Sequence, residues 1–187
     1  MITAGCDSVI KDEAAITEYD TIVGDGDCGY TLRDGALQVL SFIRNVDLSE
    51  LPSALSDLVD DLEVNMGGTS GALYCIFLSS LAQNLSDAPS FPEALKGALN
   101  HLLTYTRARL GDRTVLDCLI PFTEILAETG DAKKAFQEAA RGVESTKKLE
   151  AKMGRSSYLD EAATRGVPDP GAYGLLKLLE GMVGAQQ

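Results

Sequence analysis

The sequence lacks the features that mark membrane and nucleic-acid-binding proteins. It has no run of about 18 apolar residues, the length that a membrane-spanning helix needs. Its start, Met1-Ile2-Thr3-Ala4-Gly5, has neither the basic segment nor the apolar core of a secretion signal, so we expect a cytoplasmic protein. Lys and Arg total 16 against 28 Asp and Glu, and the longest basic run is Lys147-Lys148. The net charge of −12 disfavours a nucleic-acid partner, because phosphate backbones attract clustered cations.

Histidine and paired cysteines are scarce as well. His101 is the only histidine and lies in a leucine-rich segment without a nucleophile-elbow sequence, so we expect it to pack or to meet solvent rather than to catalyse. The cysteines, Cys6, Cys28, Cys75 and Cys118, are far apart and form no Cys-x-x-Cys pair. This spacing indicates reduced thiols and disfavours both a disulfide framework and a structural zinc site.

Helical periodicity, by contrast, runs through almost the whole chain. Apolar residues recur at the three- and four-residue spacing of one helix face, and no alternating strand pattern interrupts them. The segments do not resemble one another, which favours a bundle over a repeat array. We expect one all-α domain over residues 1–187, built from eight helices near 3–18, 32–43, 51–62, 73–85, 91–102, 115–126, 135–143 and 175–183.

Capping sequences support these helix starts. A side chain that can accept a backbone hydrogen bond precedes three of the helical runs, and in two cases a proline follows within the first turn. The three sequences are Asp47-Leu48-Ser49-Glu50, Ser90-Phe91-Pro92-Glu93 and Asp169-Pro170-Gly171.

Residues 19–31 resist the helical interpretation and concentrate acidic side chains. Asp20, Asp25 and Asp27 lie within eight residues, separated by glycines that let the backbone turn tightly. Hard divalent cations prefer such oxygen ligands, and without a cation the like charges repel. The alternative is a set of turn and N-cap aspartates. An EF-hand is excluded because the twelfth position counted from Asp25 is Ala36 rather than Glu.

A glycine-rich segment, Met66-Gly67-Gly68-Thr69-Ser70-Gly71, directly precedes a helical run. Unhindered backbone N–H groups and two hydroxyls before a helix can cradle a phosphate, although the lysine of a Walker sequence is missing. The alternative is a plain helix–helix connection that Thr69 or Ser70 caps.

Residues 152–171 form a second irregular stretch, rich in Gly, Ser and Pro. Within it, Arg155 is a candidate phosphate clamp; the alternative is a surface arginine paired with an acid. Gly111-Asp112-Arg113-Thr114 also opens a helix. A chain with so few clustered cations holds a polyphosphate only with divalent ions, so a metal site and a phosphate site predict each other.

Five ordered motifs resemble the nucleotide-binding L-type domain of dihydroxyacetone (glycerone) kinases, a family that includes triokinase/FMN-cyclase members. The motifs are Asp20-x4-Asp25-Gly-Asp27-Cys28-Gly29, Met66-Gly-Gly-Thr-Ser-Gly-Ala-Leu-Tyr74, Gly111-Asp-Arg-Thr-x-Leu-Asp117, Gly154-Arg-Ser-Ser-Tyr158 and Pro168-Asp-Pro-Gly171. The resemblance covers almost the whole chain. It implies an antiparallel eight-helix barrel with the nucleotide at one end, and ATP with two Mg²⁺ ions as cofactors.

The resemblance also implies residue roles. The ligands of the two Mg²⁺ ions would be Asp20, Asp25 and Asp27. Nucleotide or phosphate contacts would come from Cys28, Gly29, Tyr30, Thr31, Thr69, Ser70, Thr114, Val115, Arg155, Asp169, Pro170 and Gly171. Cys28 stands where phosphoprotein-dependent subunits usually carry histidine, which favours the ATP-using branch. Thr106 stands where relatives often have a glycine near the adenine, and Tyr30 stands where they often have a small residue or threonine. For Tyr30, only the contact of the backbone N–H is therefore carried over.

The resemblance implies a partner too. In this family a separate K-type domain holds the ketose covalently through a histidine, and nothing in this sequence resembles that domain. We therefore expect the chain to be the C-terminal domain of a longer kinase, or a subunit that works with a K-type partner. Two alternatives remain: a lyase that cyclises FAD at the same site (FAD-AMP lyase activity), and a non-catalytic nucleotide-sensing module.

Overall fold

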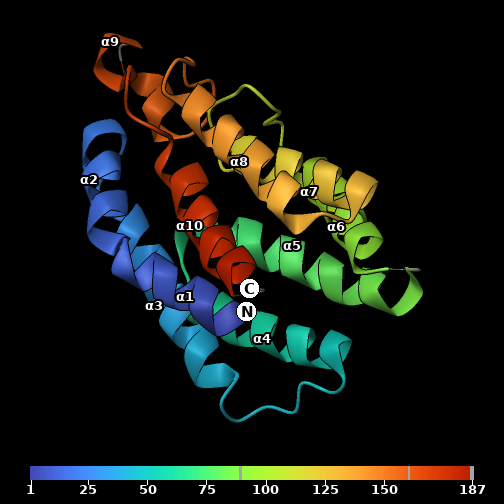
Figure 1. Cartoon of the computed structure of the whole chain (residues 1–187). Coiled ribbons are helices and arrows are strands. Elements are labelled where there is room, and N and C mark those ends of the chain that lie inside the picture. Colours follow the sequence, from blue (N-terminus) through green and yellow to red (C-terminus); the bar gives the residue numbers. More distant parts are fainter. Residues whose placement is uncertain (89, 160, 186–187) are drawn as a thin grey trace.

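The computed structural model describes residues 1–88, 90–159 and 161–185, and every regular element in these ranges is helical (Figure 1). The all-α prediction is confirmed. The long helices are α1 (Ile2–Lys11), α2 (Glu13–Val23), α3 (Cys28–Phe42), α4 (Leu51–Asn65), α5 (Gly68–Asp87), α6 (Phe91–Tyr105), α7 (Leu116–Thr129), α8 (Ala132–Thr146) and α10 (Pro170–Gly184). Between α8 and α10 lie a 3₁₀ turn, η1 (Arg155–Tyr158), and the short α9 (Glu161–Thr164).

Eight of the described helices close into a ring. In the order α1, α3, α4, α5, α6, α7, α8 and α10, each packs against the next, and α10 returns to α1. The start of α1 therefore lies beside the end of α10 (Figure 1). Helix α2 continues α1 and, like α1, packs against α3 and α10. The antiparallel eight-helix barrel that the family resemblance implies is confirmed.

The helix expected over residues 3–18 is instead two helices, α1 and α2, which meet at Asp12. The Asp12 carboxylate accepts a hydrogen bond from the Tyr173 hydroxyl at 3.3 Å and pairs with the Lys177 ammonium at 3.0 Å. These partners on α10 are distant in sequence, which is why periodicity alone misses the break. Helix α2 also extends to Val23, so Asp20 lies on its last turn rather than in a loop.

Close helix contacts at glycines hold the ring together. A Cβ atom at Gly181 of α10 would lie 2.1 Å from the Ala4 carbonyl oxygen of α1. At Gly29 of α3 it would lie 2.1 Å from the Thr17 hydroxyl oxygen of α2. Both distances are far below van der Waals contact, so only glycine allows these backbones to approach. The Gly29 contact fixes the start of α3 against α2, where the aspartates lie.

The helix ends support most of the capping predictions. Ser90 accepts a hydrogen bond from the Glu93 N–H at 3.4 Å, and Asp169 accepts one from the Ala172 N–H at 2.8 Å. Asp47 instead accepts a hydrogen bond from the Ser49 N–H, two residues ahead of α4, so it shapes a turn and does not cap the helix.

Other sequence-based expectations are met in the described structure. All four cysteines are free thiols, and His101 is exposed with its ring 5.2 Å from that of Tyr105. No helix in the described ranges is both long and apolar enough to cross a bilayer.

Candidate functional site

Three carboxylates converge where α2 ends and α3 begins. Asp20 lies on the last turn of α2, Asp25 in the connection, and Asp27 directly before α3. One oxygen atom from each lies within 4.8 Å of the other two, in a group that could hold a metal ion. Asp20 is buried and its Oδ2 accepts a hydrogen bond from the Cys28 N–H at 3.0 Å, whereas Asp25 and Asp27 are exposed. The cluster therefore has one fixed carboxylate and two that face solvent.

The glycines of the connection make this convergence possible. Gly26 has φ of +78°, a conformation that other residues adopt only with strain. A Cβ atom at Gly24 would lie 2.2 Å from Asp20 Oδ1, so a larger residue would displace the buried carboxylate. A regular helix would instead have spread these side chains around its axis.

Asp27 does not behave as a helix cap, although it occupies the capping position of α3. Its side chain accepts no capping hydrogen bond. Partial burial, together with the carboxylates of Asp25 and Asp20, raises the pKa of Asp27, and Arg155 opposes this rise. The N-cap alternative therefore leaves Asp27 unexplained, while repulsion among the carboxylates is what a cation would relieve.

The long loop after α8 reaches back to the cluster. The Arg155 Nη1 atom lies 2.9 Å from Asp25 Oδ2, and the Ser156 hydroxyl donates to the Val23 carbonyl oxygen at 2.7 Å. The Arg155 side chain is 71% exposed, so the ion pair adds little stability and the guanidinium remains accessible to an anion. Arg155 is thus paired with an acid, as the surface alternative predicted, but that acid belongs to the aspartate cluster.

The start of α10 joins the same end of the barrel. Asp169 is buried, and its N–H donates to the Thr146 hydroxyl at 2.9 Å. Burial raises the pKa of Asp169 to about 6, and the nearby carboxylates of Asp117 and Asp20 add to this effect. A Cβ atom at Gly171 would lie 3.7 Å from the Val115 Cβ. The predicted contact residues on α10 and before α7 are therefore neighbours, close to Asp20.

The glycine-rich segment opens α5 without a side-chain cap. Helix α5 begins at Gly68 after Gly67, and neither Thr69 nor Ser70 caps it, so the capping alternative is wrong. Gly67, Gly68 and Thr69 are exposed, and a Cβ atom at either glycine would meet no atom within 4 Å. The segment therefore presents free backbone N–H groups at the positive end of a long helix, a good setting for an anion.

Helix α5 also turns one face toward the site. Ser70 and Tyr74 are one helical turn apart and share a face. Burial, followed by the nearby Cys28, Cys118 and Asp169, raises the pKa of the Tyr74 hydroxyl. Burial, followed by the surrounding aspartates, likewise raises the pKa of Cys28 to about 12, so its thiol is protonated at neutral pH. The inner face of α5 thus lies near both Cys28 and Asp169.

Some predicted residues are less closely tied to the cluster. Tyr30 is 48% exposed, and the Arg33 guanidinium lies 5.2 Å from the centre of its ring. The Thr31 N–H donates to the Asp27 carbonyl oxygen within the helix start. Thr106 follows α6 and accepts a hydrogen bond from the Ala108 N–H in its own loop. The ligand and contact roles of all the predicted residues stay predictions.

Sequence reasoning assigned no role to two buried charged residues, Arg113 before α7 and Asp117 in its first turn. The Asp117 carboxylate accepts hydrogen bonds from the Gly111 N–H at 2.6 Å and the Thr114 N–H at 2.8 Å. Arg113 is 1% exposed. The available signal was an arginine directly after a glycine-bearing turn with an aspartate four residues later, but the pattern does not reveal that both side chains point inward.

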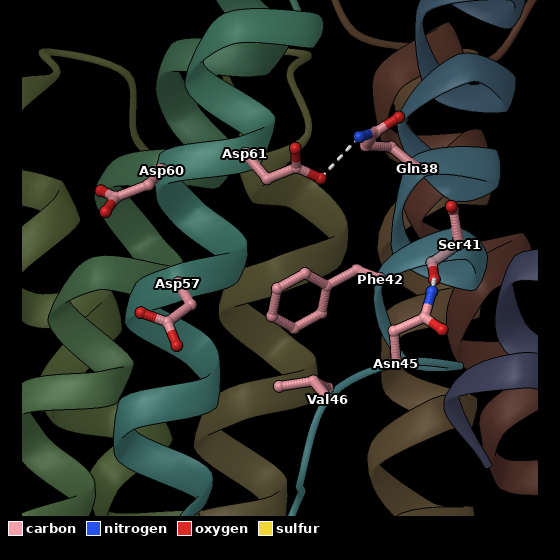
Figure 2. Close-up of a pocket in the computed structure, with 8 residues that line it drawn as sticks. All are labelled: Gln38, Ser41, Phe42, Asn45, Val46, Asp57, Asp60 and Asp61. Atoms are coloured by element: carbon pink, nitrogen blue, oxygen red, sulfur yellow. Dashed lines mark hydrogen bonds between the residues drawn. The ribbon is translucent and has the colours of Figure 1, made fainter.

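A separate hollow of about 580 Å³ lies between α3 and α4, away from the predicted site residues (Figure 2). Phe42 and Val46 contribute apolar surface there, and the Gln38 side-chain amide donates to Asp61 Oδ2 at 2.5 Å. Asp57 and Asp60 also line it.

Comparisons with known proteins identify relatives of this chain. The DAK2 domain model matches residues 22–184. The chain is 42% identical to a dihydroxyacetone kinase of Pichia angusta over 99% of its length and 34% of that protein, and 35% identical to the mouse triokinase/FMN cyclase over 89% of its length and 31% of that protein. A crystal structure of the C. freundii dihydroxyacetone kinase with AMP-PNP and Mg²⁺ has a TM-score of 0.83 at 28% identity, covering 98% of this chain and 33% of that one.

The chain therefore spans about a third of the length of these relatives. The family match begins two residues after Asp20 and extends to the end of α10, so it includes Asp25 and Asp27 of the cluster. From the ring of helices, the ordered motifs and these matches together, we conclude that the chain belongs to the DAK2 domain family.

Proposed function

We propose that this chain binds ATP with Mg²⁺ and supplies the γ-phosphoryl group that is transferred to dihydroxyacetone or glyceraldehyde held by a separate K-type domain. The observation that carries the proposal is the convergence of Asp20, Asp25 and Asp27 within 4.8 Å. It is supported by the C. freundii relative, whose structure is a complex with AMP-PNP and Mg²⁺.

The donor set suits the proposed cofactor. Mg²⁺ prefers oxygen ligands and usually binds through one or two carboxylates together with substrate phosphates. Asp20, Asp25 and Asp27 would hold the two ions, which supply charge neutralisation to the phosphates when bound. The free N–H groups at Gly68 and Thr69 would orient phosphate oxygens, and the accessible Arg155 guanidinium would add a cation.

The ketose would come from a K-type domain, in the same chain or on a partner subunit. The chain spans only a third of the kinases that it matches, which supports a separate substrate-binding part. The substrate hydroxyl would then meet the γ-phosphoryl group at the end of the barrel that carries the aspartates. A cytoplasmic location, with neither membrane nor nucleic acid as a partner, fits this function.

The test is a transfer assay with a separately produced K-type domain from a dihydroxyacetone kinase. The chain, ATP, Mg²⁺ and dihydroxyacetone are followed by ³¹P NMR with and without that domain. We expect a phosphorylated ketose only when both proteins are present. Robust transfer by the chain alone would contradict the need for the partner; nucleotide binding without transfer in the mixture would favour a sensing module.

A second candidate activity is the cyclisation of FAD at the same site. It is favoured by relatives named triokinase/FMN cyclase in mouse and in cattle. Incubation of the chain with FAD and Mn²⁺, followed by chromatography for a cyclic flavin phosphate, tests it directly. Turnover that disappears in Asp25→Asn would assign this activity to the aspartate cluster.

A further inference from the structure

Arg113 is the largest of the fully buried side chains in the described structure, with 1% of its surface exposed. It is also the one non-glycine residue in the described ranges with a positive φ, at +61°. A left-handed backbone favours glycine, so an arginine is strained at this position. The conformation turns the side chain inward from the connection between α6 and α7.

The guanidinium joins two segments that are distant in sequence. Its Nε atom donates to the Thr146 carbonyl oxygen at 3.2 Å, and its Nη2 atom donates to the Val167 carbonyl oxygen at 3.0 Å. Thr146 is the last residue of α8, and Val167 precedes α10. Arg113 therefore links the end of one helix to the approach of another.

The link continues to the start of α10. Arg113 contacts the backbone of Thr146. The hydroxyl of the same residue accepts a hydrogen bond from the Asp169 N–H at 2.9 Å. The Asp169 carboxylate in turn accepts one from the Ala172 N–H at 2.8 Å. A continuous set of hydrogen bonds thus runs from Arg113 through Thr146 to the first turn of α10.

The segments at the two ends of this set also lie next to each other. Gly171, two residues after Asp169, lies next to Val115, two residues after Arg113. These are the segments to which the family resemblance assigns nucleotide contacts. Arg113 itself is buried behind them and is not among the residues of the aspartate cluster.

The charges agree with the hydrogen bonds. Asp169 is buried beside Asp117 and Asp20, and Arg113 is the cation that opposes the rise in the pKa of Asp169. Asp117 already accepts two backbone hydrogen bonds, while Arg113 Nη1 finds no hydrogen-bond partner among the described residues. A buried charge is tolerated only with a compensating group, and Arg113 and Asp169 compensate each other.

We propose that Arg113 is a positioning residue for the nucleotide: it holds Thr114–Val115 and Asp169–Gly171 in register without touching the ligand. The inference deepens the proposed nucleotide-binding function and rests on it. It assigns the guanidinium two tasks, the link from α8 to α10 and the compensation of the Asp169 charge. Both tasks leave the three aspartates between the last turn of α2 and the start of α3 in place.

Two variants separate these tasks from general folding. Arg113→Gly suits the left-handed backbone and removes the side chain, whereas Arg113→Lys keeps a positive charge. Arg44→Gly is the matched control, because Arg44 is exposed in the loop that follows α3, at the end opposite the aspartates. Circular dichroism at the assay temperature establishes that each variant is folded; if Arg113→Gly is not, Arg113→Lys carries the test.

The closing experiment measures two affinities for each protein: that for Mn²⁺ alone, by electron paramagnetic resonance, and that for AMP-PNP with Mg²⁺, by calorimetry. We expect Arg113→Gly to weaken nucleotide binding about tenfold or more, since it removes charge-assisted hydrogen bonds. Arg113→Lys should recover part of that loss. Mn²⁺ affinity should change less than about twofold, because the carboxylates are unchanged.

Nucleotide affinity in Arg113→Gly equal to that of Arg44→Gly would overturn the inference. A parallel fall of Mn²⁺ and nucleotide affinities would also overturn it, because it would show a general collapse of the site. Failure of the unmodified chain to bind AMP-PNP would instead contradict the proposed function, so the two failures are distinguishable.

Discussion

Two groups of three aspartates, both in the first third of the chain, differ in what they can do. Asp20, Asp25 and Asp27 bring their oxygens within 4.8 Å of one another. Asp57, Asp60 and Asp61 line the hollow between α3 and α4 (Figure 2), but the described residues form no metal-holding group there. Similar residues at similar spacing thus give two different surfaces.

The backbone explains the difference. Asp57, Asp60 and Asp61 lie on the regular helix α4, where each residue is turned about 100° from the last and rises about 1.5 Å, which spreads the side chains. The other group spans a helix end and a connection with Gly24 and Gly26, which fold the carboxylates together. Overall charge does not distinguish the two groups, because both lie in the same acidic part of the chain. Residues 1–66 hold 14 of the 28 acidic and 3 of the 16 basic residues.

The largest predicted effect breaks the comparison directly. Asp25→Asn with Asp27→Asn should lower the Mg²⁺-dependent affinity for AMP-PNP at least about a thousandfold, because two oxygen ligands lose their charge. Asp57→Asn with Asp60→Asn makes the same charge change in the other group and should alter the affinity less than about twofold. Calorimetry of both double variants measures this, and equal losses would show that only net charge matters.

A pH titration of stability should show the next largest effect, at Asp169. A folded-state pKa of about 6 instead of 3.8 means that the folded protein binds this proton more tightly than the unfolded chain. Its contribution is therefore complete below pH 3.8 and is lost as the pH rises through 6, up to about 3 kcal/mol.

Asp169→Asn removes this titration and retains a residue that can cap α10. Urea unfolding without divalent cations, from pH 4 to 7, should show the unmodified chain losing stability relative to the variant as the pH rises. A constant difference across this range would contradict the raised pKa.

Gly29→Ala should destabilise the fold by about 2 kcal/mol, because its Cβ would collide with α2 at Thr17 and at the Glu13 carbonyl oxygen. The control is Gly67→Ala, which adds a Cβ into open space at an ordinary φ of −84°. Urea unfolding of the two variants compares them. An equally small loss of unfolding free energy in both variants would mean that the contact at Gly29 does not fix the connection between α2 and α3.

The smallest effect concerns repulsion within the converged group. Without divalent cations, Asp27→Asn should raise the free energy of unfolding by about 0.5 kcal/mol, since it removes one of three close like charges at an exposed position. With saturating Mg²⁺ this gain in stability should disappear, because Asp27→Asn also removes one of the proposed carboxylate ligands of the ion. Thermal unfolding under both conditions would show it, and no dependence on Mg²⁺ would argue that the carboxylates are independent.

Most of the fold could be predicted from the sequence, because the ring helices carry apolar stripes and capping sequences mark the starts of α6 and α10. The break at Asp12 could not, since it faces Lys177 and Tyr173 from the opposite end of the chain. The composition of residues 19–31 suggested a loop, yet Asp20 lies on a helix because α2 packs against α3 through Gly29.

For the site, the ordered motifs located the aspartates, the glycine-rich segment and the α10 start, and the fold places all three at one end. The buried contacts of Arg113 could not be predicted, because they arise from a left-handed turn and from carbonyl groups 33 and 54 residues away. Local sequence does not indicate which charged side chain such a turn buries.

The central claim is that the α2–α3 aspartates bind the nucleotide through divalent cations. The most direct measurement is calorimetric titration of the unmodified chain with AMP-PNP, once with excess Mg²⁺ and once with a chelator. We predict one nucleotide bound per chain with Mg²⁺ and no measurable binding with the chelator. The same affinity in both titrations, or no binding in either, would contradict the claim.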